Sequence, residues 1–198
     1  AAAVTAAAGL IALAVSLLVT EAWVGLAWSL TVLAMGLVSI RLRVPALRVL
    51  AAVLAGFAGL AVTLEADDSL DLPAGFGAFA DAVVRTGLPT AALAGAAIAL
   101  LRRGEDLWAQ FVQAMAAVLG ALFVYIAIRS WFPMPVQPGV DWNGWELGLI
   151  VVLIAAYALG LGWLAVRRRG RLGGRLLPWI ASAAGTLALA LIAYGALQ

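Results

Sequence analysis

The sequence predicts an all-α protein that crosses a membrane several times, about seven times in all. Three observations lead to this fold class: hydrophobic residues make up 66% of the 198 positions, charged residues make up only 11%, and long apolar runs recur along the chain. An ordinary soluble domain is nearer half apolar and a quarter charged, and a soluble chain of this size has too much surface to bury nearly every residue. In lipid, only helices and closed barrels satisfy their backbone groups, and the lengths of the runs favour helices.

Seven apolar runs define the expected transmembrane helices of this bundle. Most hold roughly 18–22 residues, or about 30 Å of helix, which matches the hydrocarbon core of a bilayer. The fourth run is the shortest, and the stretch Pro73–Val84 before it mixes aromatic, glycine and aspartate residues, which is typical of an interfacial or short re-entrant piece. The expected spans are residues 1–19, 22–40, 47–64, 87–101, 107–128, 145–166 and 176–197.

Arginine residues predict the orientation of the chain. Threading the chain back and forth places ten of its twelve arginines on one side, and only Arg85 and Arg129 fall on the other. Because cytoplasmic loops carry the excess of positive charge, we expect the arginine-rich face and Ala1 in the cytoplasm and Gln198 outside. Both ends adjoin apolar runs, without an initiator methionine or a charged leader, so we expect residues 1–198 to form a single transmembrane helical domain of a longer protein.

Missing residue types exclude several classes of function. The chain has no cysteine and no histidine, which removes disulfides, metal sites built from these residues, cysteine nucleophiles and histidine acid–base catalysis. Coupled transporters usually need an ionisable residue or a broken helix at mid-membrane, and no expected run has either at its centre. We therefore expect no enzymatic activity and no cofactor within this chain. The net charge of +2, without a long basic stripe, argues against nucleic-acid binding.

Two opposite charges border neighbouring runs at the outer boundary. Arg129 ends the fifth run and Glu146 opens the sixth. An arginine close to hydrocarbon needs an anionic partner, so we interpret Arg129 and Glu146 as a buried pair that holds two helices together; a site for a substrate anion is the alternative. The acidic run from Glu65 to Asp71 lacks the glycine and the distal glutamate of a calcium-binding loop, and we expect it to be a solvated surface.

Tryptophan residues gather near the ends of the expected helices. At this depth they form the aromatic belt that anchors membrane proteins among lipid headgroups. The alternative is a platform in the outer loop that binds a sugar or a lipid headgroup, formed by Trp131, Trp142 and Trp145.

Small residues recur at four-residue spacing along the fourth run. The series consists of Gly87, Ala91, Gly95 and Ala99. Such a face lets helix backbones approach closely in lipid, where no hydrophobic force drives helices together. Packing within this bundle is the preferred interpretation, and a docking surface for a partner or for further helices is the alternative.

Three stretches of sequence carry a family resemblance. Residues 21–50 begin with Glu-Ala-Trp and end with Arg-Leu-Arg-Val-Pro-Ala-Leu-Arg-Val-Leu; Gly-Leu-Pro at 87–89 precedes Leu-Arg-Arg-Gly-Glu-Asp at 101–106; and Ile-Ala-Ile-Arg-Ser-Trp-Phe at 126–132 precedes Trp-Glu-Leu at 145–147. In these motifs the chain resembles the polytopic bacterial membrane proteins grouped as domain of unknown function 2339, but Ala127 stands where we associate the family with a glutamate. The resemblance covers nearly the whole chain and implies one part of a longer, many-helix protein of the bacterial inner membrane. It implies no activity, because that family is uncharacterised.

The expected function is therefore that of a non-catalytic scaffold or assembly subunit in a bacterial inner-membrane complex. Its partners are the lipid bilayer and other membrane subunits or further helices of the same protein. The first alternative is a transporter or flippase for a lipid or glycan, with its site at the outer loops or outside these residues. The second is a glycan-modifying enzyme whose catalytic residues lie elsewhere in the longer protein.

Overall fold

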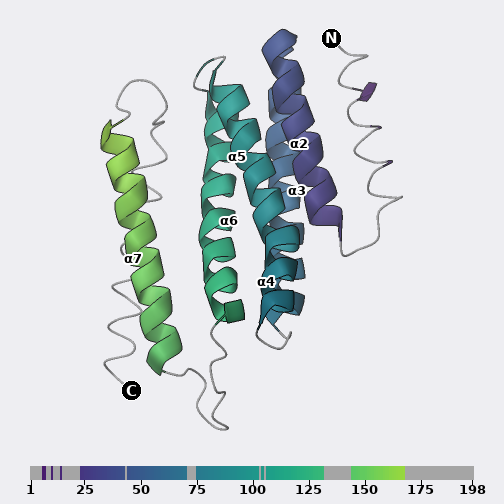
Figure 1. Cartoon of the computed structure of the whole chain (residues 1–198). Helices are drawn as coiled ribbons and strands as arrows, with labels where there is room; N and C mark the ends of the chain where they lie inside the picture. Colours follow the sequence, from purple (N-terminus) through teal and green to yellow (C-terminus); the bar gives the residue numbers. More distant parts are fainter. Residues whose placement is uncertain are drawn as a thin grey trace.

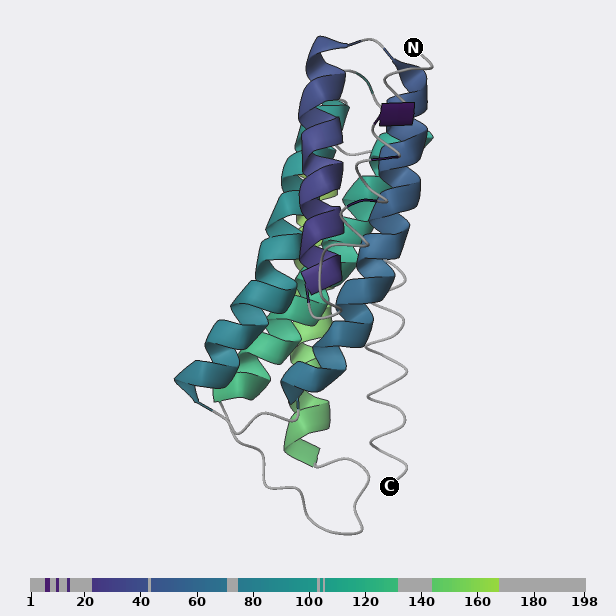
Figure 2. The same ribbon diagram turned by 90° about the vertical axis from the view of Figure 1, so that its right-hand side faces the viewer.

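The computed structural model describes residues 6, 7, 10, 14, 23–42, 44–70, 75–102, 104, 106–131 and 144–167. Over these residues the fold is helical and contains no strand, which confirms the all-α prediction. Figures 1 and 2 show the helices side by side along one common direction, as an elongated bundle. The elements in chain order are α2 (Val24–Arg41), α3 (Pro45–Leu70), α4 (Phe76–Ala82), the π-helical segment η2 (Val83–Gly87), α5 (Leu88–Leu101), α6 (Leu107–Trp131) and α7 (Gly144–Arg167).

Four helical segments of the described chain are long and apolar enough to cross a membrane. They correspond to the second, third, fourth and fifth expected runs. The sixth run, 145–166, lies within α7, and the described side chains of that helix, Gly148–Gly160, form an apolar segment. The first and seventh runs, 1–19 and 176–197, lie outside the described residues apart from four isolated positions in the first. The membrane-length segments are Val24–Arg41, Pro45–Ala66, Phe76–Leu101 and Leu107–Ser130.

The third of these segments, which corresponds to the fourth expected run, is longer than the sequence predicts. α4, η2 and α5 form one continuous helical segment, Phe76–Leu101, of 26 residues. A proline such as Pro89 lacks an N–H and crowds the carbonyl four residues earlier, which normally ends or kinks a helix. Here the chain passes through a π turn, in which the N–H of Leu88 donates to the carbonyl of Val83, and the helix continues. The prediction of a helix limited to 87–101, with an interfacial or re-entrant piece before it, is therefore wrong.

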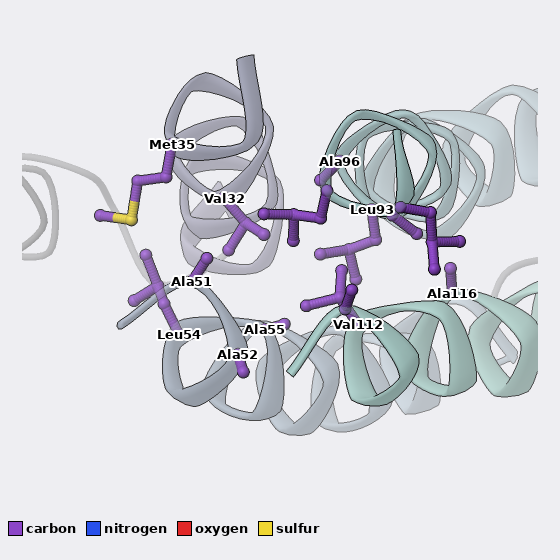
Figure 3. Packing of buried hydrophobic residues seen from close by; sticks show 14 of the residues in the cluster. Val32, Met35, Ala51, Ala52, Leu54, Ala55, Leu93, Ala96, Val112 and Ala116 are labelled. Atoms are coloured by element: carbon purple, nitrogen blue, oxygen red, sulfur yellow. The ribbon is translucent and has the colours of Figure 1, made fainter. Parts of the chain in front are cut away.

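The four membrane-length segments surround one apolar core. α2 packs against α3 and α5, and α6 packs against the same two helices from the other side. Val32 of α2, Ala55 of α3, Leu93 of α5 and Val112 of α6 are all fully buried, and Figure 3 shows these four helices converging on the same space. α7 packs against α6 at the edge of the bundle (Figure 1).

Two glycines bring α2 unusually close to its neighbours. A Cβ atom at Gly36 would lie 3.2 Å from both the Cα and the carbonyl oxygen of Ala96 in α5. A Cβ atom at Gly25 would lie 2.7 Å from Cγ2 of Val62 in α3 and 3.1 Å from the backbone nitrogen of that residue. Both contacts are therefore of the small-residue type by which helices associate in membranes.

Candidate functional site

The ion pairs and the buried carboxylate of the described residues lie toward the two ends of the bundle. We call the end where α2 and α5 finish and α3 and α6 begin the arginine end. Counting roughly 20 residues from it, the number that crosses a hydrocarbon core, leads to Glu65 in α3, Ala82 in α4 and Ile126 in α6. Ala66, Ala82 and Ile126 form one buried cluster, so these positions do lie at one level. We call that level the outer end.

The arginine end contains a polar pocket of about 450 Å³. Across it, Nη1 of Arg48 forms an ion pair with Oδ2 of Asp106. The other carboxylate oxygen of Asp106 accepts a hydrogen bond from the backbone N–H of Ala109 at 2.8 Å, and so caps the first turn of α6. One aspartate therefore fixes the start of α6 and holds an arginine of α3 beside the pocket. The lining residues are Ser39, Leu42, Val44, Pro45, Arg48, Arg102 and Asp106.

The outer end ties α2 to α3 through Glu65. This side chain is only 9% exposed, and its Oε1 atom accepts a hydrogen bond from the backbone N–H of Gly25 at 2.9 Å. The N–H groups of a first helical turn have no partner within the helix, and they give that end a partial positive charge. The expectation of a solvated acidic surface is therefore wrong at Glu65, because its carboxyl group caps a neighbouring helix.

A second charged pair lies within the helix that runs from Phe76 to Leu101. Nε of Arg85 lies 2.9 Å from Oδ1 of Asp81, one helical turn earlier, and about a quarter of each side chain is exposed, at 26% and 24%. The next residue, Thr86, is fully buried. The sequence analysis assigned these residues to an outer loop because the expected helix began at Gly87. The four-residue spacing of an aspartate and an arginine was the available sign of a helix.

The predicted pair of Arg129 and Glu146 stays a prediction. Arg129 lies in the last turn of α6, where its Nη1 atom donates a hydrogen bond to the hydroxyl of Tyr125 at 3.2 Å. Glu146 lies in the first turn of α7, a helix that packs against α6. The side chain of Glu146 falls outside the part of the chain that the structure describes.

The proposed aromatic platform also stays a prediction. Trp131 is the last residue of α6 and Trp145 is the second residue of α7, but their side chains lie outside the described set. Trp142 lies wholly outside it.

The glycines of the predicted small-residue face contact two different helices. A Cβ atom at Gly87 would lie 2.9 Å from Cε2 of Phe123 in α6, and one at Gly95 would lie 3.1 Å from Cδ1 of Leu33 in α2. Ala99 is buried, whereas Ala91 is exposed. The two glycines thus serve contacts inside this bundle.

An apolar groove of about 560 Å³ separates α6 from α7. Aliphatic residues and the rings of Tyr125 and Tyr157 line it. The hydroxyl of Tyr157 donates a hydrogen bond to the carbonyl oxygen of Ala117 and so links the two helices. A lining of this kind suits a hydrocarbon chain and offers little to a polar ligand.

Comparison with protein-family models gave no match. Neither curated proteins nor solved structures gave a match. The site is therefore interpreted from its own geometry.

Proposed function

We propose that this chain is a non-catalytic scaffold or assembly subunit of a bacterial inner-membrane complex. The proposal includes seven transmembrane helices, a cytoplasmic N-terminus and membership of the uncharacterised family named above. What supports it first is the hydropathy and length of four helical segments, which fit a bilayer.

The observation that carries the proposal is the filled core of the bundle. Between α2 and α5, the backbones at Gly36 and Ala96 approach so closely that a Cβ atom at Gly36 would lie only 3.2 Å from backbone atoms of Ala96. Around this contact the core consists of fully buried aliphatic side chains from four helices (Figure 3). Close packing of this kind transmits force and resists deformation, which suits a subunit that holds others in place.

An exposed apolar stripe on α3 provides a surface for such partners. Val53, Phe57, Leu60 and Leu64 recur at helical spacing and are 48%, 53%, 58% and 68% exposed, respectively. In a membrane this stripe faces lipid or another transmembrane helix. A scaffold requires contact with another transmembrane helix over part of its surface.

Co-purification tests the proposal. The full-length protein, extracted from its own membrane in mild detergent, is expected to retain at least one membrane protein in stoichiometric amount, identified by mass spectrometry. A photo-crosslinker at Leu60 of the stripe is expected to capture that same partner. A crosslinker at Leu159 of α7, which is 75% exposed on another helix, serves as the matched control for non-specific capture.

A transporter or flippase for a lipid or glycan is the second candidate, favoured by the apolar groove between α6 and α7. Proteoliposomes separate the two functions. A scaffold leaves the rate at which a fluorescent phospholipid changes leaflets equal to that of empty liposomes. Accelerated exchange, together with the loss of every stoichiometric partner, would replace the scaffold proposal with transport.

A further inference from the structure

The polar pocket at the arginine end carries an excess of positive charge. Arg48 of α3 and Arg102 at the end of α5 both line it, and Asp106 is the one carboxylate among the lining residues that the structure describes. Asp106 engages Nη1 of Arg48, and among the described residues the guanidinium has no second acidic partner, so its remaining N–H donors can bind a ligand. Arg102 is exposed and forms no ion pair with any residue that the structure describes. Two guanidinium groups therefore border a space of about 450 Å³, and within the described part of the chain only that of Arg48 has an acidic partner.

The depth of this pocket matches that of lipid headgroups. Two of the four membrane-length segments end at Arg41 and Leu101, and the other two begin at Pro45 and Leu107. The lining residues lie at or next to these four boundaries. Basic pockets between transmembrane helices at such boundaries on the cytoplasmic side bind the phosphate groups of anionic lipids.

Apolar surface continues from the pocket toward the interior of the membrane. Leu42 lines the pocket and is 42% exposed, and Val38, one turn earlier on α2, is 40% exposed. A ligand with a phosphate group and an attached hydrocarbon chain fits both features. A free anion would contact only the polar pocket and not the apolar surface beside it.

We propose that the pocket formed by Arg48, Arg102 and Asp106 binds a phosphate group, supplied by the headgroup of an anionic phospholipid. Arg102 supplies the charge that the phosphate neutralises, and Arg48, held by Asp106, supplies further N–H donors. This site rests on the membrane orientation that we propose above, but it requires no protein partner, so its test and the co-purification test of the scaffold can fail separately.

A lipid titration of the full-length protein tests the site. The protein in a neutral detergent is titrated with short-chain phosphatidylglycerol, and the dissociation constant is read by native mass spectrometry. Arg102→Gln is expected to weaken binding about tenfold, the size of one lost charge-assisted hydrogen bond. Arg41→Gln is the matched control, because Arg41 is an exposed arginine at the same end of the bundle but does not line the pocket. It is expected to bind like the native protein.

Two further arms identify the source of the phosphate. Short-chain phosphatidylcholine, which carries a compensating positive charge, is expected to bind more weakly than phosphatidylglycerol to the native protein. Inorganic phosphate is expected to compete only weakly. If inorganic phosphate binds with the same dependence on Arg102 and displaces the lipid at equal concentration, the lipid is overturned as the source and the site takes a free phosphate.

A separate variant protects the test against loss of folding. If Arg102→Gln lowers the melting temperature, Arg48→Lys replaces it, because lysine preserves the charge beside Asp106 but loses the planar fork of donors. That variant is expected to weaken phosphatidylglycerol binding several-fold. Equal binding by the native protein and the folded pocket variants overturns the proposal, and so does an equal loss in Arg41→Gln.

Discussion

The carboxyl group of Glu65, near the end of one membrane-length helix, accepts a hydrogen bond from the backbone N–H of Gly25 at the start of another, with an N···O distance of 2.9 Å. Trp23, the N-cap residue of α2, makes no capping hydrogen bond with its side chain. α2 is therefore capped from a neighbouring helix. The glycine also lets Glu65 approach, since a Cβ atom at Gly25 would lie 3.2 Å from Oε2 of the glutamate.

Replacing Glu65 with alanine is expected to lower the free energy of unfolding by about 1–3 kcal/mol, the cost of leaving a buried donor without its partner. The measurement is reversible unfolding in mixed micelles. Leu64→Ala is the matched control, because Leu64 is adjacent and 68% exposed, and its effect is expected to stay within about 0.5 kcal/mol. Equal effects of the two substitutions would contradict a capping role for Glu65.

A methyl group at Gly36 is expected to disrupt the contact between α2 and α5. In Gly36→Ala the new Cβ meets backbone atoms of Ala96 at 3.2 Å, and neither helix can yield without moving as a whole. We expect a loss of about 1–3 kcal/mol in the free energy of unfolding, the usual cost of overpacking.

The matched control for that substitution is Gly56→Ala in α3. There the new Cβ lies 3.8 Å from ring carbons of Phe111, an ordinary contact. Because alanine is the better helix former, this variant is expected to be more stable than the native protein by about 0.5–1 kcal/mol. Opposite signs for the two glycines support the close backbone contact, and stabilisation by both substitutions would show that helix propensity alone governs both positions.

Much of the helical framework was predictable from the sequence. A membrane-spanning helix needs a long apolar run, and such a run is a property of its own stretch of sequence. The expected runs 22–40, 47–64 and 107–128 lie within α2, α3 and α6 or within two residues of them. Where the prediction failed, the cause was an interaction with a distant part of the chain or a rarer backbone geometry. α3 continues through Glu65 because that carboxyl group finds a partner in α2. The segment Phe76–Leu101 extends to the N-terminal side of Pro89 because one π turn accommodates the proline.

The candidate site was less predictable than the helices. The arginines of the loops indicated orientation, but nothing in their spacing showed that Arg48 meets Asp106, 58 residues further along the chain. The small-residue series of the fourth run indicated close packing. Periodicity alone did not reveal that Gly87 and Gly95 face two different helices.

Two substitutions at Asp106 are expected to separate its two roles. Asn is about as good as Asp at capping a helix N-terminus, so Asp106→Asn keeps the hydrogen bond to Ala109 and loses only the ion pair with Arg48. For a pair that is 19% and 33% exposed we expect that loss to be at most about 1 kcal/mol. Asp106→Ala is expected to cost about 0.5–2 kcal/mol more, because the cap is lost as well. Equal unfolding free energies for the two variants would show that capping contributes nothing.

Single-cysteine labelling is expected to place the ends of the bundle on opposite sides of the membrane. Residues 1–198 contain no cysteine, so each introduced thiol is the only one in this part of the protein. Phe76→Cys marks the outer end, where the native side chain is 74% exposed, and Arg102→Cys marks the arginine end. A membrane-impermeant maleimide is expected to label Phe76→Cys in intact spheroplasts, and Arg102→Cys only after lysis, because arginine-rich faces lie in the cytoplasm.

A third cysteine, at Arg168 after α7, tests the predicted number of crossings. If α6 and α7 both span the bilayer, Arg168→Cys lies on the same side as Arg102→Cys and is protected until lysis. Labelling of Arg168→Cys in intact spheroplasts, with Arg102→Cys still protected, would mean that α7 does not cross. The seven-helix topology would then be wrong, although the bundle formed by α2 to α6 would still span the membrane.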